Sequence, residues 1–148
     1  MTDPVAAPVL VLRAVVPATP HTCLRPNHRA PRIAKWRAGM DLKEAAFLAA
    51  VDALSGAGFA AVPADGPLWL EAAVYWEKGR RRQDLDGCIS SLKGAIDGAC
   101  RALGADDGRI RGISVDQVTT TEPQGAVFLT VYAGPWPWGG GADAEERA

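Results

Sequence analysis

The sequence predicts an α+β domain in two layers, with a small sheet of about four strands packed by two main helices. Four segments are rich in β-branched or alternating apolar residues, two segments have the spacing of an amphipathic helix, and their order is β-α-β-α-β-β. The chain has 148 residues, of which 48% are hydrophobic, so one domain of this size can bury a core without a disulfide or a metal. We expect the domain to span residues 1–133 and a flexible, Gly-rich, acidic tail to span residues 134–148.

The first half of the chain contains one strand and one main helix. The strand is predicted over Val9–Val16, because β-branched residues dominate it and prolines follow it. The next segment, His21–Arg37, is basic and interrupted by prolines, which predicts an irregular start and a helical end. Asp41 and Glu44 resemble a capping box, so we expect the main helix to begin there and to cover residues 42–54.

The second main helix follows a strand that alternates in polarity over residues 68–77. Six apolar residues then recur at intervals of four, three, four, three and four, which lines one helical face. They are Leu85, Ile89, Leu92, Ile96, Ala99 and Leu103. Gly104 ends this helix.

The last third of the chain predicts two further strands, over Ile110–Val118 and Ala126–Ala133, with residues 122–125 as a hairpin loop between them. The tail lacks periodicity, and Trp136 and Trp138 are available there to fold back onto the domain.

The cysteines and the hydropathy of the sequence indicate in which cellular compartment the protein is located. Cys23, Cys88 and Cys100 are odd in number and form no CxxC motif, which indicates reduced thiols. The sequence has no apolar run of the length that a membrane span needs, and its start lacks the pattern of a signal peptide. We therefore expect a cytoplasmic protein without a membrane partner.

The charges are segregated, although the net charge is only -1. Residues 13–39 contain five arginines and one lysine but no carboxylate, and a second basic run covers residues 78–82. The part of the first segment from His21 to Arg37 is either a solvated loop or a surface that contacts phosphate.

Asp84 and Asp86 stand two residues apart beside the second basic run, a pattern that suits a divalent metal acting on phosphate. The alternative is a polar loop in which Asp86 caps the following helix. Spacing alone favours the polar loop, because short acidic patterns are common.

A second acidic pair, Asp106 and Asp107, follows the same helix. A helix of roughly fifteen residues is about 20 Å long, so the two pairs can meet only if the helix is short or bent, or if the chain turns back along it.

The motif R-R-R-x-D-L-D, with Lys93 seven residues after the second aspartate, Asp97 four residues further on and then a D-D pair, resembles the RusA family of Holliday-junction resolvases, particularly its phage-type members. The segment LRPNHR at residues 24–29 is similar to the N-terminal part of that family. The resemblance covers about residues 24–132. Gly87 departs from it, since the family usually has Asn at this position.

The resemblance implies a homodimeric, Mg²⁺-dependent endonuclease that cuts four-way DNA junctions symmetrically in recombination and repair, with Mn²⁺ as an alternative ion. It implies that Asp84, Asp86 and Asp107 hold the metal and that Lys93 stabilises charge on the phosphate, so that these four residues are catalytic. The residues expected to bind DNA are Arg25, Asn27, Arg29, Arg80, Arg81 and Arg82.

Two other functions stay open. The departure at Gly87 allows a protein that binds branched DNA without cutting it. A small-molecule phosphohydrolase would use the same carboxylates, with little salt dependence of substrate affinity.

Overall fold

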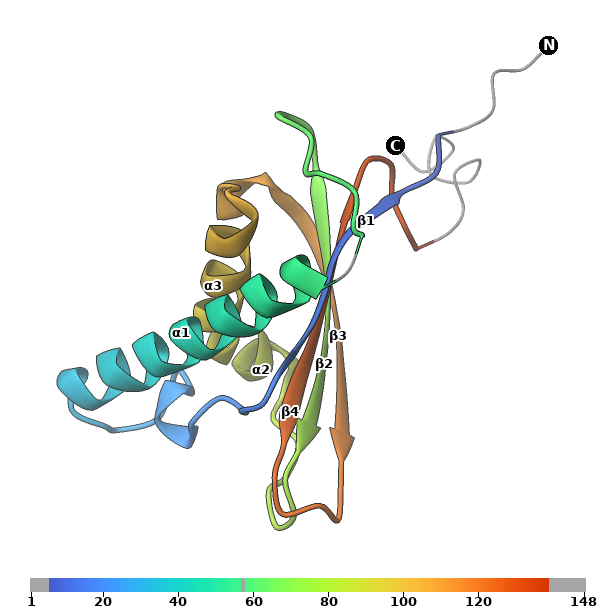
Figure 1. The fold of residues 1–148 in the computed structure, drawn as a ribbon. Helices are drawn as coiled ribbons and strands as arrows, with labels where there is room; N and C mark the ends of the chain where they lie inside the picture. The colour runs from blue at the N-terminus through green and yellow to red at the C-terminus, as the bar shows by residue number, and fades with distance from the viewer. Residues whose placement is uncertain (1–5, 57, 139–148) are drawn as a thin grey trace, which may run out of the picture.

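The structure, a computed structural model, describes residues 6–56 and 58–138. The fold has two layers. A four-stranded sheet forms the first, and the helices form the second, which covers one face of the sheet (Figure 1). The α+β class predicted from the sequence is confirmed. None of the helices described has the length and apolar character needed to cross a membrane.

The four predicted strands are all present, each within two residues of its expected bounds. They are β1 (Val9–Val16), β2 (Leu68–Trp76), β3 (Ile110–Thr119) and β4 (Ala126–Ala133). Their order in the sheet is β1-β4-β2-β3. Strand β4 runs antiparallel to both of its neighbours, whereas β2 and β3 are parallel.

The predicted hairpin over residues 122–125 is wrong, because β3 and β4 are not neighbours in the sheet. The helical crossover after β2 returns the chain to the end of the sheet at which β2 began, so β3 pairs in parallel on one side of β2. The loop then passes the end of β2, and β4 pairs on its other side.

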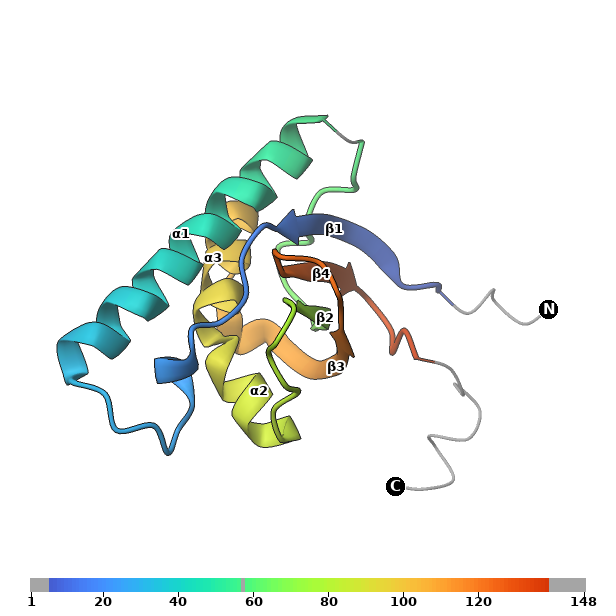
Figure 2. The ribbon, with the colours of Figure 1, turned by 90° about the horizontal axis from the view of Figure 1, so that it is seen from below.

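The first main helix, α1 (Arg32–Gly56), is twice as long as the predicted segment. The carbonyl oxygen of Pro31 accepts hydrogen bonds from the backbone N–H groups of Ala34 and Lys35 at its start. Asp41 and Glu44 therefore lie inside the helix, and the predicted capping box is wrong. With 25 residues α1 is about 37 Å long, and its N-terminal half extends beyond the sheet (Figures 1 and 2).

The second predicted helix is two helices, α2 (Leu85–Ser91) and α3 (Lys93–Leu103). The break falls at Leu92, where ψ is -4° and the N–H group is shared between the carbonyl oxygens of Cys88 and Ile89, at 3.2 and 3.1 Å. The Leu92 side chain is completely buried. The predicted apolar face therefore continues from α2 to α3 through Leu92, although the helix itself is broken there.

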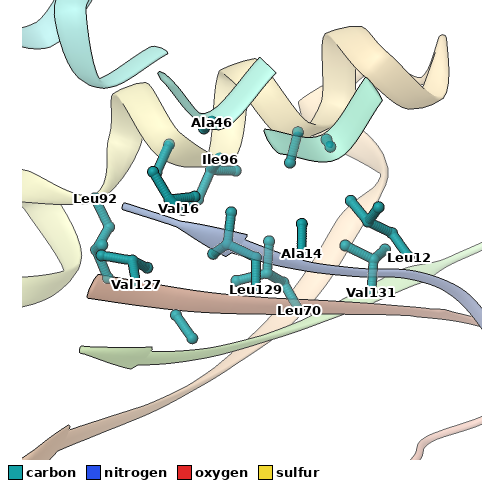
Figure 3. Packing of buried hydrophobic residues seen from close by; sticks show 14 of the residues in the cluster. Leu12, Ala14, Val16, Ala46, Leu70, Leu92, Ile96, Val127, Leu129 and Val131 are labelled. Atoms are coloured by element: carbon teal, nitrogen blue, oxygen red, sulfur yellow. The ribbon is translucent and has the colours of Figure 1, made fainter. Parts of the chain in front are cut away.

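The core lies between the sheet and the helices, as Figure 3 shows for Leu70 and Leu129 of the sheet below Ala46 and Ile96 of the helices. Helices α1 and α3 pack closely through glycines. A Cβ atom on Gly94 would lie 2.6 Å from the carbonyl oxygen of Gly39, so a larger residue here would push the helices apart.

The C-terminal segment packs on the face of the sheet opposite the helices. Nε1 of Trp69 donates to the carbonyl oxygen of Gly134 at 2.8 Å, and the rings of Trp69 and Trp136 lie 4.8 Å apart. Nε1 of Trp138 donates to Oε1 of Glu71 at 2.6 Å. Both tail tryptophans thus fold back onto the sheet as expected. The rest of that tail, residues 139–148, lies outside the described residues.

Candidate functional site

Asp84 is positioned by a polar network behind it. The backbone N–H of the buried Gln83 donates to Oε1 of Gln117 at 2.9 Å, and Nε2 of Gln117 donates back to the carbonyl oxygen of Gln83 at 2.8 Å. Nε1 of Trp76 donates to the same Oε1 atom at 2.9 Å. Strands β2 and β3 therefore hold the residue that precedes Asp84 in place.

Neither glutamine was among the residues that the sequence pointed to. One signal was available for Gln117, because it continues the inward-facing alternation of Ile113 and Val115 in β3. A glutamine at a core-facing position needs a hydrogen-bonding partner. No comparable pattern identified Gln83.

The carboxylates of Asp84 and Asp86 form a pair at the N-terminus of α2. A hydrogen bond shared with Asp86, together with the charge of that carboxylate, raises the pKa of Asp84, while the charge of Arg25 acts to lower it. Asp84 is the N-cap residue, and its side chain makes no capping hydrogen bond. Asp86 lies in the first turn, so the alternative in which Asp86 is the capping residue is not observed. Two exposed carboxylates in contact repel each other unless a proton or a cation lies between them.

The N-terminal loop brings a cation to this pair. Arg25 follows a short 3-10 helix (Thr22–Leu24). The side-chain amide of Gln83 has one orientation in which both its oxygen and its nitrogen form hydrogen bonds, and in this orientation the oxygen accepts from Nε of Arg25 at 3.2 Å. In this orientation the amide nitrogen of Gln83 donates to the carbonyl oxygen of Gly87 at 3.2 Å. Asn27 and Arg29 are exposed in the same loop.

Gly87 lies directly beneath the carboxylate of Asp84. A Cβ atom on Gly87 would stand 2.5 Å from Oδ1 of Asp84, and its three nearest neighbours would all be atoms of Asp84. Any side chain at position 87 is therefore incompatible with this conformation of Asp84. The glycine that departs from the RusA pattern is matched to the placement of the first aspartate.

A second cluster surrounds Lys93, the first residue of α3. Its Nζ atom lies 3.3 Å from Oδ1 of Asp97 and 3.4 Å from Oδ2 of Asp107. The contacts with Asp97, and to a smaller extent those with Asp107, raise the pKa of Lys93. In turn, the hydrogen bond and the charge of Lys93 lower the pKa of Asp107.

The chain turns back after α3 to place Asp107 there. Gly104 adopts φ 67°, and the next N–H, of Ala105, donates to the carbonyl oxygen of Cys100 at 3.0 Å. Oδ1 of Asp106 then accepts from the N–H of Gly108 at 2.7 Å, which makes Asp106 a turn residue. The turn and the reach of the Lys93 side chain together bring the helix exit back to the start of α3.

A hollow of about 410 Å³ adjoins the Lys93 cluster. It lies between the helices and β3, with Ile89, Ile96 and Ile113 in its apolar lining and Lys93 and Asp107 in its polar lining. Ile89 is one turn beyond Asp86, so the hollow extends from the α2 side of the site to Asp107.

The three expected metal ligands do not form a single group. Within residues 6–56 and 58–138, no three His, Cys, Asp or Glu side chains are grouped so that they could hold a metal. Asp84 and Asp86 form one pair, whereas Asp107 belongs to the Lys93 cluster. The Asp84–Asp86 pair alone fits Mg²⁺, because this ion takes one or two carboxylates and keeps waters as its other ligands.

Arg80, which was expected to bind DNA, makes internal contacts in the structure. Its Nη1 atom donates to the carbonyl oxygen of Pro20 at 2.9 Å and to Oε1 of Glu77 at 3.1 Å, and its guanidinium lies 4.4 Å from the centre of the Trp76 ring. The neighbouring Arg81 and Arg82 are exposed. Of the arginine run, only these two point to solvent and are available to an external phosphate.

The sequence was compared with models of known protein families and with curated proteins. Neither comparison found a match.

Proposed function

We propose that this chain is a metal-dependent endonuclease of the RusA type, which hydrolyses phosphodiester bonds in four-way DNA junctions during recombination and repair. The observation that carries the proposal is the placement of Asp84 and Asp86 at the exposed start of α2, next to Gln83, whose side chain is within 3.2 Å of Nε of Arg25. This arrangement combines ligands for a hard cation with a positive charge suited to phosphate.

The metal belongs with the carboxylate pair. Asp84 and Asp86 would hold Mg²⁺, or Mn²⁺ in its place, and the bound ion would supply an activated water and neutralise charge on the phosphate. The Gln83–Gln117 network holds in place the backbone that precedes Asp84. Asp107 would be the third ligand. Its carboxylate is paired with Lys93, so it would have to leave this contact to reach the ion.

Lys93 supplies positive charge on the other side of the hollow. Asp97 holds its ammonium group at 3.3 Å, and 72% of the side chain is exposed, so an external phosphate can reach it. An ammonium group placed there stabilises negative charge that develops on a phosphate during hydrolysis.

DNA contacts are proposed for four arginines and Asn27, all but Arg25 exposed, in the N-terminal loop and in the segment before the carboxylate pair. Arg25, Asn27 and Arg29 approach from the N-terminal loop, and Arg81 and Arg82 from the segment before Asp84. Arginine binds phosphate through two parallel hydrogen bonds, and each neutralised phosphate adds salt-dependent affinity.

A homodimer is also part of the proposal. The sheet face opposite the helices bears an exposed apolar surface, in which the rings of Tyr75 and Phe128 lie 5.0 Å apart and Val15 is 49% exposed. A second copy would bury this surface, and light scattering on the purified chain tests it. We also propose a cytoplasmic location, where the three free cysteines would stay reduced.

A protein that binds junctions without cutting them is the second candidate, and the geometry at Gly87 favours it. Gly87 has no side chain, so the amide that the RusA pattern usually has at this position is missing next to Asp86. Such a protein would bind junctions tightly and leave them intact with either Mg²⁺ or Mn²⁺.

Direct titration with Mn²⁺ tests the metal site. Asp84→Asn and Asp86→Asn should each weaken binding of the ion, and Asp65→Asn, at an exposed position outside the site, should leave it unchanged. Turnover of a four-way junction with a strong salt dependence supports the nuclease, whereas turnover of a soluble phosphate ester with little salt dependence would indicate a phosphohydrolase.

A further inference from the structure

Trp36 is the most exposed of the large hydrophobic side chains described, with 61% of its surface open to solvent. It lies in the N-terminal half of α1, which extends beyond the sheet (Figure 2). Ile33 and Met40, one turn away on either side, are also exposed, at 57% and 44%. The core therefore does not account for an indole at this position.

The Trp36 side chain borders a groove between α1 and the junction of α2 with α3. The groove has a volume of about 270 Å³. Trp36 and Met40 contribute apolar surface, and Lys35, Lys43 and Lys93 also line it. The groove thus leads from an exposed aromatic ring to the lysine of the candidate site.

The charges of the groove favour a polyanion. Asp97 is the one carboxylate among its lining residues, and it is already paired with Lys93 at 3.3 Å. The segment around Trp36, residues 25–37, adds four arginines and no carboxylate, namely Arg25, Arg29, Arg32 and Arg37. A ligand that fits must therefore carry repeated negative charge together with flat apolar surfaces, and single-stranded nucleic acid has both.

We propose that Trp36 is a stacking platform for one unpaired nucleobase, and that Lys35 and Lys43 hold the phosphates of the same strand where it enters the groove toward Lys93. The inference deepens the proposed function, on which it rests for the identity of the strand as one arm of a branched DNA. Bases at a branch point unstack at lower cost than bases within a duplex, so they are available for such a contact. The stacking contact itself requires nucleic-acid binding but not cleavage.

The test compares binding of two oligonucleotides of equal length, one of thymidylate and one of abasic sites, which share phosphates but differ in bases. The chain should bind the thymidylate oligomer about tenfold more tightly, because stacking on an aromatic side chain depends on the base. Trp36→Ala should remove this preference and leave the salt slope unchanged, whereas Trp36→Phe should keep part of it. Lys43→Gln should instead reduce the salt slope, by about 0.7 for one phosphate, and keep the preference.

Leu48→Ala is the matched control, since Leu48 is a comparably exposed residue of α1, at 58%. It should leave both the preference and the salt slope unchanged. Circular dichroism checks that each variant folds, and truncation of an exposed indole should not unfold the chain.

Three results would overturn the inference: no preference for the thymidylate oligomer in the unaltered chain, an undiminished preference in Trp36→Ala, or a loss of self-association in Trp36→Ala without any change in oligonucleotide binding. The last result would assign this surface to a protein partner. The inference and the proposed function fail separately. If the base preference depends on Trp36 but the chain never cuts junctions, the stacking site stands and the nuclease proposal fails. If the chain cuts junctions normally but Trp36→Ala keeps the full base preference, the nuclease proposal stands and the stacking site fails.

Discussion

The Nζ atom of Lys93 lies 3.4 Å from Oδ2 of Asp107, although fourteen residues separate them in the sequence. The contact spans the whole of α3 and depends on the turn at Gly104. It joins the first residue of α3 to the turn beyond its last residue, whereas Asp84 and Asp86 are not grouped with Asp107. The Lys93 cluster is thus a product of the fold.

Replacing Lys93 tests whether that cluster acts on phosphate. Lys93→Met should lower junction cutting about a hundredfold or more, as expected for loss of a group that stabilises developing charge. The free energy of unfolding should change by less than about 1 kcal/mol, because exposed ion pairs contribute little. Lys78→Met, at an exposed position outside the cluster, is the control. Undiminished cutting by Lys93→Met would remove Lys93 from the catalytic residues.

A double-mutant cycle tests the relation between Gly87 and Asp84. In the unaltered chain Gly87→Ala should give no gain in stability, because the new Cβ atom would stand 2.5 Å from Oδ1 of Asp84. In an Asp84→Ala background the same change should stabilise the chain by about 0.5 kcal/mol, since alanine is favoured over glycine in a helix. Urea denaturation of the four proteins measures the difference. Equal effects of Gly87→Ala in both backgrounds would show that the two positions are independent.

The two neighbouring arginines should respond in opposite ways. Arg80→Ala removes hydrogen bonds to Pro20 and Glu77, so it should destabilise the chain by about 1–2 kcal/mol and leave the salt dependence of DNA binding unchanged. Arg81→Ala should leave stability unchanged and reduce the salt slope by about 1. Thermal melts and binding isotherms at several salt concentrations check both. A reduced salt slope for Arg80→Ala in a folded chain would contradict the internal role.

Glu77 should make folding stability depend on pH. Burial raises the pKa of Glu77, but hydrogen bonds from its own backbone N–H, Thr19 and Arg80 outweigh burial and lower it below the ordinary value of 4.5. A group with a lowered pKa in the folded state stabilises the fold above the ordinary value and loses this effect as the pH falls through the lowered one. The chain should therefore be more stable than Glu77→Gln at pH 7, by about 1 kcal/mol, and equal to it near pH 2. The control is Glu122→Gln, at an exposed position; a Glu77→Gln difference that persists at low pH would contradict the account.

The strands were predictable because each keeps one face buried against the core. Residues 126–133 alternate between buried and more exposed positions along their whole length, and this periodicity is present in the sequence. The pairing of the strands was not predictable in the same way. The loop at residues 122–125 has the composition of a hairpin, but the parallel pairing of β2 with β3 depends on the path of the crossover helices.

Local motifs failed where long-range packing determined the structure. The pattern at Asp41 and Glu44 resembles a helix start, yet α1 begins at Arg32 and continues through it. The turn before Asp41 is held by packing against α3, where Gly39 lies against Gly94. The internal role of Arg80 depends on Pro20, sixty residues earlier. The separation of the two acidic pairs followed from the length of the helical segment between them, but the pairing of Asp107 with Lys93 was not visible from the sequence.

Strand-resolved cleavage of a synthetic four-way junction tests the central claim most directly. The chain, Asp84→Asn and Asp107→Asn are each incubated with the junction and with a linear duplex of the same sequence, with and without Mg²⁺. The account predicts paired nicks at symmetric positions of the junction alone, which require Mg²⁺ and disappear in Asp84→Asn while junction binding remains. Loss of the nicks in Asp107→Asn as well would support its place among the ligands. Tight junction binding without a nick in Mg²⁺ or Mn²⁺, or nicks that persist in both variants, would contradict it.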